Sequence, residues 1–272
     1  MGLRKNEHSD TMDQLTLKTG EEDSLLARAE DADTDTQLVV APVKRHQRNI
    51  QRRLRELKLP KDAFIFHDLG DLSKALLAQH GTSTEKLDRI DRLAVIRSML
   101  TEDADNGSPT LSLPVGTRSN DPQYVEQIRA DVENVTNWHP ERIDAWEDAS
   151  ADLPSPTNEE SIEILETACD VERLLREQTT KAISDEELVR RATRTLAKTD
   201  GAVWEVVYPD IEQLSVLGLS SLSATQLDFV QSVIETTSVD VHIYFRTETG
   251  EFLQGRVDGV LDVSNPGFEV FE

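Results

Sequence analysis

One stretch of the sequence carries cationic side chains at helical spacing. The cations recur every three or four residues and are Lys44, Arg48, Arg52, Arg55 and Lys58. Ile50, Leu54 and Leu57 recur on the opposite side, so the spacing predicts an amphipathic helix with a cationic stripe in solvent. Such a stripe can bind the phosphate backbone of a nucleic acid without reading its sequence. No aromatic residue interleaves with it for base stacking, and the alternative is a solvated face paired with acidic residues elsewhere.

Two carboxylates near the end of the chain are similar in placement to the metal ligands of RecB-type nucleases. Asp258 and Glu269 fall in two segments that predict strands, Phe252–Leu261 and Gly267–Phe271. Carboxylate oxygens suit a divalent cation. No Lys follows at the place that such a nuclease requires, so we predict a surface hairpin and no catalytic residue.

The other reactive side chains predict no cofactor and no metal. The histidines have no metal-ligand spacing, and His67-Asp68 reads as a strand end and a turn. Cys169 is alone, which excludes an intramolecular disulfide and suits a reducing cytoplasm. It falls in an apolar helical stripe, so we expect a buried, inert thiol. The tryptophans are expected to anchor the core; they are Trp138, Trp146 and Trp204.

The segment Ile211–Phe245 predicts the elements that position a site. Leu214–Leu219 is a short apolar run, typical of a parallel strand covered on both faces. Ser223 and Gln226 have capping-box spacing and predict a helix start, and the β-branched and aromatic residues of Val239–Phe245 predict a second strand. The resulting strand–helix–strand unit places the protein in the α/β class.

A further strand is predicted upstream, over Gln37–Pro42, with a helix from Val43 onward that carries the cationic stripe. Together with Ile211–Phe245, this pattern resembles AddB-type, UvrD-like helicase–nuclease subunits over roughly residues 37–245. The resemblance implies a RecA-like, P-loop NTPase-like parallel sheet core. It rests on the order of a strand, a Gly, the Ser-Ser-Leu-Ser segment, a helix that begins with Gln-Leu and a strand that contains Val-His-Ile-Tyr, and it is strongest at its two ends.

The chain departs from this family where nucleotide chemistry is expected. Relatives carry an acidic residue for magnesium where Leu217-Gly218-Leu219 stands here, and an apolar Leu cannot coordinate a hard cation. A phosphate-binding loop needs glycines and backbone N–H groups, whereas Ala41-Pro42-Val43-Lys44 has no glycine, and Pro42 has no N–H. We therefore predict no nucleotide site and interpret Lys44 as a solvated side chain.

The sequence predicts four regions. Residues 1–36 read as a disordered acidic leader, 37–100 and 201–250 as the helicase-like core, 101–200 as a loop and an all-helical insertion, and 251–272 as a C-terminal hairpin or tail. Superfamily-1 helicases carry a helical insertion at this place. The segments that define the middle regions are a loop over Thr101–Asp121 and helices over Gln123–Thr136, Glu159–Thr179 and Ser184–Thr199.

Two capping pairs are predicted in the same part of the chain. Ser184 and Glu187 open the last of those helices, and Thr82 and Glu85 predict the start of an earlier helix. The charged residues that follow in the earlier helix read as a solvated face with ion pairs. They are Asp88, Arg89, Asp91 and Arg92.

The overall charge limits the possible partners. The 272 residues include 52 acidic and 29 basic side chains, for a net charge of −23, which argues against a surface that binds nucleic acid or anionic lipid everywhere. Spread acidity of this kind is typical of salt-loving organisms. No apolar run reaches the roughly 20 residues that span a bilayer, so we expect a cytoplasmic protein without a membrane partner.

The resemblance implies a non-catalytic helicase-like subunit or fragment that contributes DNA binding or scaffolding to recombinational repair and DNA-end processing. The expected partners are the DNA phosphate backbone and a nuclease or helicase subunit. One alternative is a protein-interaction adaptor with no DNA role. The other is an ATP-dependent helicase or exonuclease subunit.

Overall fold

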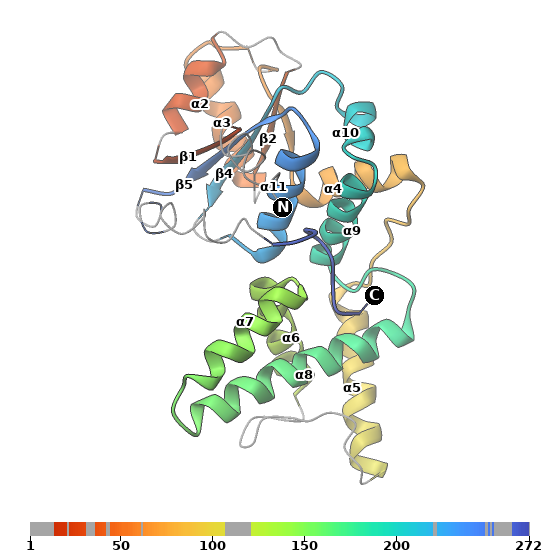
Figure 1. Cartoon of the computed structure of the whole chain (residues 1–272). Coiled ribbons are helices and arrows are strands. Elements are labelled where there is room, and N and C mark those ends of the chain that lie inside the picture. Colours follow the sequence, from red (N-terminus) through yellow and green to blue (C-terminus); the bar gives the residue numbers. More distant parts are fainter. Residues whose placement is uncertain are drawn as a thin grey trace, which may run out of the picture. The chain divides into compact units, whose positions relative to one another are not determined.

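The computed structural model describes residues 14–20, 22–30, 36–41, 44–60, 62–106, 121–219, 222–247, 250, 252 and 263–271. The chain divides into two compact units (Figure 1). The first comprises residues up to Thr82, Arg191–Leu222 and Gln226–Pro266, and the second comprises Ser83–Arg190, Ser223–Thr225 and the segment from Gly267 onward. The sequence instead predicts boundaries near residues 100 and 200.

A five-stranded parallel sheet forms the first unit. Its strands are β1 (Leu15–Thr19), β2 (Gln37–Val40), β3 (Ile65–His67), β4 (Gln213–Leu219) and β5 (Asp240–Phe245). The order across the sheet is β1-β5-β4-β2-β3, and every neighbouring pair is parallel. The register pairs Leu38 of β2 with Leu214 of β4, and Leu214 with Val241 of β5. The predicted α/β class is confirmed.

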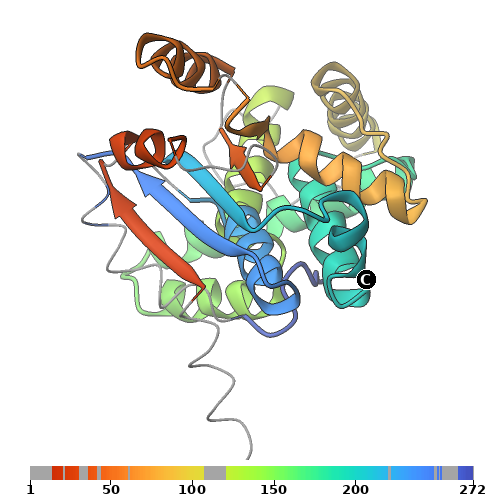
Figure 2. The same ribbon diagram turned by 90° about the horizontal axis from the view of Figure 1, so that it is seen from above.

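The predicted strand–helix–strand unit is present as β4, α11 (Ala224–Thr236) and β5. The helix begins directly after Ser223, as the capping pattern indicates, and its predicted apolar side chains are buried. They are Leu227, Val230, Val233 and Ile234. Figures 1 and 2 show α11 on one face of the sheet, with α2 (Glu22–Arg28) and α3 (Lys44–Glu56) on the other.

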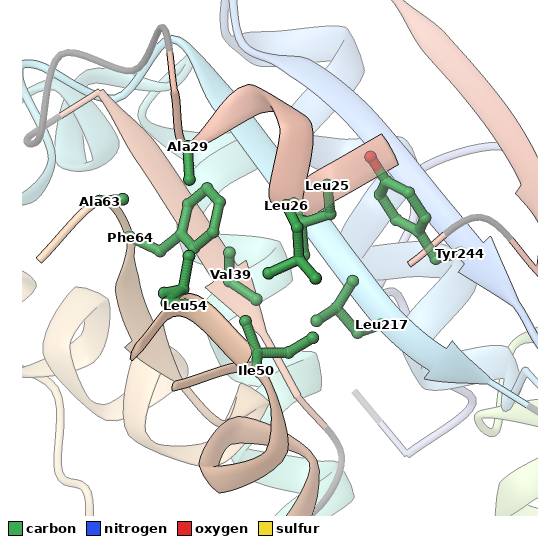
Figure 3. Close-up of a cluster of buried hydrophobic side chains, with 10 residues drawn as sticks. All are labelled: Leu25, Leu26, Ala29, Val39, Ile50, Leu54, Ala63, Phe64, Leu217 and Tyr244. Atoms are coloured by element: carbon green, nitrogen blue, oxygen red, sulfur yellow. The ribbon is translucent and has the colours of Figure 1, made fainter. Parts of the chain in front are cut away.

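A hydrophobic cluster fixes α2 and α3 to the sheet (Figure 3). The two helices contribute Leu25, Leu26, Ile50 and Leu54, and Ala29 follows the end of α2. Val39, Leu217 and Tyr244 belong to β2, β4 and β5, and the segment before β3 adds Ala63 and Phe64. Fully burying one such aliphatic side chain stabilises a fold by about 1.5–3 kcal/mol, so this cluster sets the orientation of α3.

The prediction of a disordered leader over residues 1–36 was wrong for the described part. Residues 15–19 form β1, which pairs with β5 from Leu15↔Val241 to Thr19↔Phe245. Residues 22–28 form α2, whose Leu25 and Leu26 are at most 2% exposed. The acidic composition of this region predicts disorder. The pairing that forms β1 could not be predicted locally, because its partner strand lies more than 200 residues later in the chain.

The second unit is helical. Its helices are α5 (Arg89–Asn106), α6 (Pro122–Thr136), α7 (Pro140–Ala151), α8 (Thr157–Gln178) and the first residues of α9 (Asp185–Lys198). The predicted helices in these regions are confirmed as α6, α8 and α9, and the backbone N–H of Glu187 donates to the predicted cap Ser184. α7 was not predicted.

Two predictions about α5 were wrong. Thr82 and Glu85 do not start it; the Asp88 carboxylate instead accepts from the backbone N–H groups of Ile90 and Asp91, at 2.7 and 2.9 Å. A short polar side chain next to the first turn is the effective cap. The helix also continues to Asn106, into the region predicted as a loop, while residues 107–120 lie outside the described part.

Two short helices complete the first unit beside the latter part of α9. They are α4 (Leu69–His80) and α10 (Ala202–Val207). His67 ends β3, which confirms the predicted strand end. In place of the predicted turn, Asp68 caps α4 and accepts from the Asp71 N–H at 2.7 Å. Trp138 and Trp204 are fully buried, as expected of core anchors, and Trp146 is half-buried.

The C-terminal hairpin is not seen in the described residues. Gly267–Phe271 contains no strand, and Asp258, the other carboxylate of the predicted pair, lies outside the described part. The segment instead lies in the second unit, where its side chains contact helices. The side chains that it buries or half-buries are Glu269 and Phe271, whereas Phe268 and Val270 are exposed.

Candidate nucleic-acid interface

The carboxyl edge of the sheet has a switch point between β2 and β4. β2 leads through α3 to β3 on one side, whereas β4 leads through α11 to β5 on the other. Open α/β sheets bind ligands in the crevice outside the carboxyl ends of the strands at such a point. The start of α3 lies directly after β2, so α3 is the first candidate for contact with a ligand.

α3 presents predicted cations to solvent. Lys44, Arg48, Arg52 and Arg55 are all exposed, and their spacing of three or four residues places them on one face of the helix. Arg52 Nε lies 3.6 Å from Glu56 Oε1, but both side chains are more than 60% exposed, so water screens the pair. Arg55 Nε donates to the Gln51 carbonyl at 3.2 Å.

Lys58 does not belong to the helical stripe. It is exposed, lies beyond the end of α3 and has φ 60°, the left-handed conformation of a helix C-cap. Its N–H donates to the Arg55 carbonyl, and the Leu59 N–H donates to the Leu54 carbonyl at 2.9 Å. This turn packs Leu59 against the cluster of Figure 3 and leaves Leu57 57% exposed, so the prediction that Leu57 lies on the buried face was wrong.

Sequence reasoning missed a cation at the same edge of the sheet. Arg246 follows β5 directly and is exposed, and its Nη2 atom lies 3.2 Å from Nε2 of His46 on α3. The two residues are 200 positions apart in the chain. The available signal was the placement of Arg246 at the end of a predicted parallel strand, because the carboxyl ends of parallel strands meet at one edge.

The structure turns Leu217 away from any ligand. Leu217 is the first residue of Leu217-Gly218-Leu219, and its side chain is 1% exposed in the cluster of Figure 3. Lys44 is the first residue of α3, and its side chain is exposed. Pro42 and Val43, between β2 and α3, lie outside the described residues. Across the described ranges, no group of three His, Cys, Asp or Glu residues is arranged to hold a metal ion.

The second unit contains a buried ionic network that the sequence did not predict. Arg129 on α6 is 1% exposed and lies within 2.8–2.9 Å of the carboxylates of Glu126, Glu133 and Glu172. Arg92 also contacts Glu126, at 2.7 Å. The half-buried Arg92 was therefore misassigned to a solvated face. Glu126 and Glu133 lie three and four residues from Arg129 on α6 itself, whereas Glu172 lies on α8 and Arg92 on α5. Spacing along the chain gives no signal for the contacts between helices.

Burial and charge act in opposite directions on the carboxyl groups of this network. Burial alone raises the pKa of Glu133, but the charges of Arg129 and Arg190 outweigh it and hold that pKa below its usual value. Burial, reinforced by the charge of Glu133, raises the pKa of Glu172 despite the nearby Arg129. Arg129, Arg176 and Arg190 each pair with more than one buried acid of the network.

Glu269, the other residue of the predicted metal pair, belongs to this network. Its carboxylate is 1% exposed and pairs with Arg176 and Arg190 at 2.7 and 2.8 Å. The two arginines balance the charge of this carboxylate and occupy its oxygens, so it is not a candidate metal ligand. Cys169 is half-buried, and burial raises the pKa of its thiol to about 11, which keeps it protonated and unreactive at neutral pH.

The fold defines an α/β protein built on a parallel sheet, with a cationic helix after β2. The chain belongs to the family described as Halobacterial UvrD-like protein, whose model matches residues 1–272. The match supports a UvrD-like, helicase-like relationship over the whole chain. No curated protein matches the sequence.

Among the helices of the described residues, none is both long enough and apolar enough to cross a bilayer.

Proposed function

We propose that this protein is a non-catalytic, helicase-like DNA-binding protein that holds the phosphate backbone of DNA on α3. The observation that carries the proposal is the exposure of Lys44, Arg48, Arg52 and Arg55 on a helix whose Ile50 and Leu54 are buried. Cations fixed on a rigid element can meet phosphates at regular spacing. The UvrD-like family match supports nucleic acid as the ligand.

The charge of α3 is opposite to that of the chain. Residues 44–56 contain six basic side chains and one acidic one, whereas the whole chain carries −23. Contact with DNA is then confined to α3, because the negative charge of the other surfaces repels the phosphates. At about 1 M salt the Debye length is about 3 Å, so repulsion from distant acids is screened, while the phosphate contacts of α3 are also weaker than at low salt.

The sheet is a RecA-like core in this proposal, and the helices between β3 and β4 are an insertion. Because the chain has no glycine-containing loop after β2 and buries Leu217 where a magnesium-binding acid is expected, the proposal includes the loss of ATP hydrolysis. The acidic composition and the family description fit a salt-adapted cytoplasm. The resemblance to AddB-type subunits suggests DNA-end processing in recombinational repair, beside a nuclease or helicase subunit.

Charge reversal on α3 tests the proposal. We expect the variant Arg48→Glu, Arg52→Glu, Arg55→Glu to lose at least about tenfold in affinity for fluorescein-labelled DNA, because each replaced contact adds a repulsion to the loss of an attraction. Fluorescence anisotropy with single-stranded and duplex DNA at about 0.1 M KCl measures the loss, at an ionic strength where the Debye length is about 10 Å.

A matched control changes the net charge equally at exposed cations outside α3. The variant Arg89→Glu, Arg97→Glu, Lys198→Glu should keep affinity within about twofold, because long-range charge is screened at this salt. Equal losses in both variants would show a general charge effect and reject α3 as the interface. Circular dichroism of both variants establishes that they are folded.

Calorimetry with MgATP tests the non-catalytic part separately. We expect no heat of binding for the wild-type chain, since neither the loop after β2 nor Leu217 offers phosphate or magnesium ligands. Binding of MgATP, or its hydrolysis in the presence of DNA, would contradict this part while leaving the role of α3 intact.

One observation favours the adaptor alternative. A groove of about 450 Å³ in the second unit has apolar walls formed by α7, α8 and the end of α6. Val135 and Leu153 in its walls are 59% and 41% exposed, beside Trp146. If the wild-type chain binds no DNA at any salt concentration, this groove becomes the leading candidate for function, as a protein-docking surface.

A further inference from the structure

The segment Gly267–Phe271 has no secondary structure, yet two of its side chains are held in the second unit. Glu269 is 1% exposed and the Phe271 ring is half-buried, whereas Phe268 and Val270 are 42% and 43% exposed. Glu269 and Phe271 thus face the second unit, while Phe268 and Val270 face solvent. A bound peptide is recognised in a similar way, through pockets that take some of its side chains and leave the others in solvent.

Two arginines bind the Glu269 carboxylate. Nη1 and Nη2 of Arg176 donate to its two oxygens at 3.0 and 2.7 Å, which is a bidentate pair. Nε of Arg190 lies 2.8 Å from Oε2. This is a complete carboxylate-binding site contributed by α8 and α9.

An aromatic site lies beside the carboxylate site. The Phe271 ring centroid is 5.5 Å from that of Trp138, in an edge-to-face arrangement, and 4.9 Å from the Arg176 guanidinium. The Val270 N–H donates to the Trp138 carbonyl at 3.0 Å and fixes the register of the segment. Together these contacts select an acidic residue followed two positions later by an aromatic ring.

The arginines have other partners that fix them without the segment. Arg176 Nε donates to Glu172 at 2.8 Å, and Arg190 Nη1 donates to Asn137 Oδ1 at 2.8 Å. Arg190 also pairs with Glu133 at 3.2 Å. Since both guanidinium groups are positioned by the helices, the site is pre-organised and persists when the segment leaves it.

We propose that Arg176, Arg190 and Trp138 form a binding site for a Glu-x-Phe-type peptide of a partner protein, and that the chain's own C-terminal segment fills this site until the partner displaces it. Tethering gives the segment a high effective concentration, so a free peptide binds weakly to the intact chain. The C-terminal segment therefore acts as an internal competitor that sets a threshold for the partner. This role is independent of DNA binding on α3.

Hydrogen exchange on the wild-type chain tests whether the segment is released. We expect the Val270 amide, corrected for its intrinsic rate, to exchange at least roughly 100-fold faster than the slowest amides of α6 and α8, because a displaceable segment opens without global unfolding. Exchange of Val270 only at the rate of those helix amides would show that the segment is a permanent part of the core and would overturn the proposal.

Peptide binding tests the site itself. The full-length variant Glu269→Ala, Phe271→Ala should bind fluorescein-labelled Pro-Gly-Phe-Glu-Val-Phe-Glu, the sequence of residues 266–272, at least about tenfold more tightly than the wild type does. The same peptide with Gln in place of its first Glu should bind at least about tenfold more weakly, since it loses the charge-assisted bidentate pair.

A matched pair of arginines on α8 supplies the control. Added to the released variant, Arg176→Gln should abolish peptide binding, and Arg173→Gln, at a side chain that is 57% exposed, should not. A folded released variant that fails to bind, or that binds the Gln peptide equally well, would contradict the proposal. If the released variant does not fold, the hydrogen-exchange result on the wild-type chain decides.

Discussion

At the scale of single residues, Arg129 pairs with several buried acids of the second unit. It is almost fully buried and compensates three acids on α6 and α8. We expect Arg129→Met to lower the free energy of unfolding by about 3–5 kcal/mol, because removing one partner leaves buried carboxylates uncompensated. Denaturant unfolding followed by circular dichroism measures this change.

Arg173→Met on α8 is the matched control. Arg173 pairs with Asp170 at 2.6 Å, but its side chain is 57% exposed, so its loss should change stability by about 0–1 kcal/mol. Losses of similar size in the two variants would mean that burial does not govern the strength of these pairs.

His242 on β5 introduces a pH dependence at the same scale. Burial, together with the charges of Arg28 and Lys18, lowers the pKa of His242 to about 4, with Asp240 acting in the opposite direction. The unfolded chain takes up this proton near pH 6.5, so stability is complete above about pH 6.5 and is lost as the pH falls towards about 4. The folded state holds the ring neutral, with Nδ1 3.5 Å from an Arg28 nitrogen.

We expect His242→Gln to remove about 1–2 kcal/mol of the stability difference between about pH 7 and about pH 5. Denaturant midpoints of wild type and variant at both pH values measure the effect. His80→Gln, at an exposed side chain, shows whether loss of any imidazole acts alike. An unchanged pH dependence in His242→Gln would contradict the assigned cause.

At the scale of elements, α3 contributes buried side chains to the core on one face and the proposed DNA-binding cations on the other. Leu54→Ala should destabilise the chain by about 2–5 kcal/mol, because Leu54 is fully buried and its loss leaves a cavity under the helix. Leu57→Ala, one turn later and 57% exposed, should change stability by less than about 0.5 kcal/mol. Thermal or denaturant unfolding of the two variants compares them directly. Equal effects would indicate that α3 continues through Leu57 as the sequence pattern predicts.

The sequence was informative where a pattern is local. The apolar runs of β4 and β5 and the Ser223 cap predicted the central strand–helix–strand unit, and the spacing of Arg48, Arg52 and Arg55 predicted the exposed face of α3. The helix end was not predictable from periodicity, because Lys58 adopts a left-handed turn without a glycine. Because of that turn, Leu59 is half-buried against the cluster of Figure 3, and Leu57 is exposed.

Features that depend on contacts between distant segments had no local signal. β1 forms only because β5 is available beside it, so its five residues in an acidic region read as disorder. α7 has few apolar residues at helical spacing, and it is held by contacts of Trp146 with α8, including a hydrogen bond to the Ser161 carbonyl at 3.2 Å. The site of Glu269 likewise needs arginines from two helices.

At the scale of the whole molecule, a strongly acidic chain carries one helix with an excess of cations, within a family described as UvrD-like. Acidity favours solubility in salt and excludes general binding to DNA, while the fixed stripe on α3 offers a local contact. The account therefore depends on whether that stripe binds phosphates. Ion release provides a direct readout, because each phosphate contact contributes roughly −0.9 to the slope of log K against log salt for duplex DNA.

The decisive measurement is this slope for the wild-type chain and for Arg48→Glu, Arg52→Glu, Arg55→Glu, from anisotropy titrations over a series of KCl concentrations. We predict measurable duplex binding by the wild type and a slope whose magnitude falls by roughly 2–3 in the variant, as three phosphate contacts are lost. Equal slopes and affinities for the two proteins, or no binding by the wild type, would contradict the assignment of α3 as a DNA-binding surface.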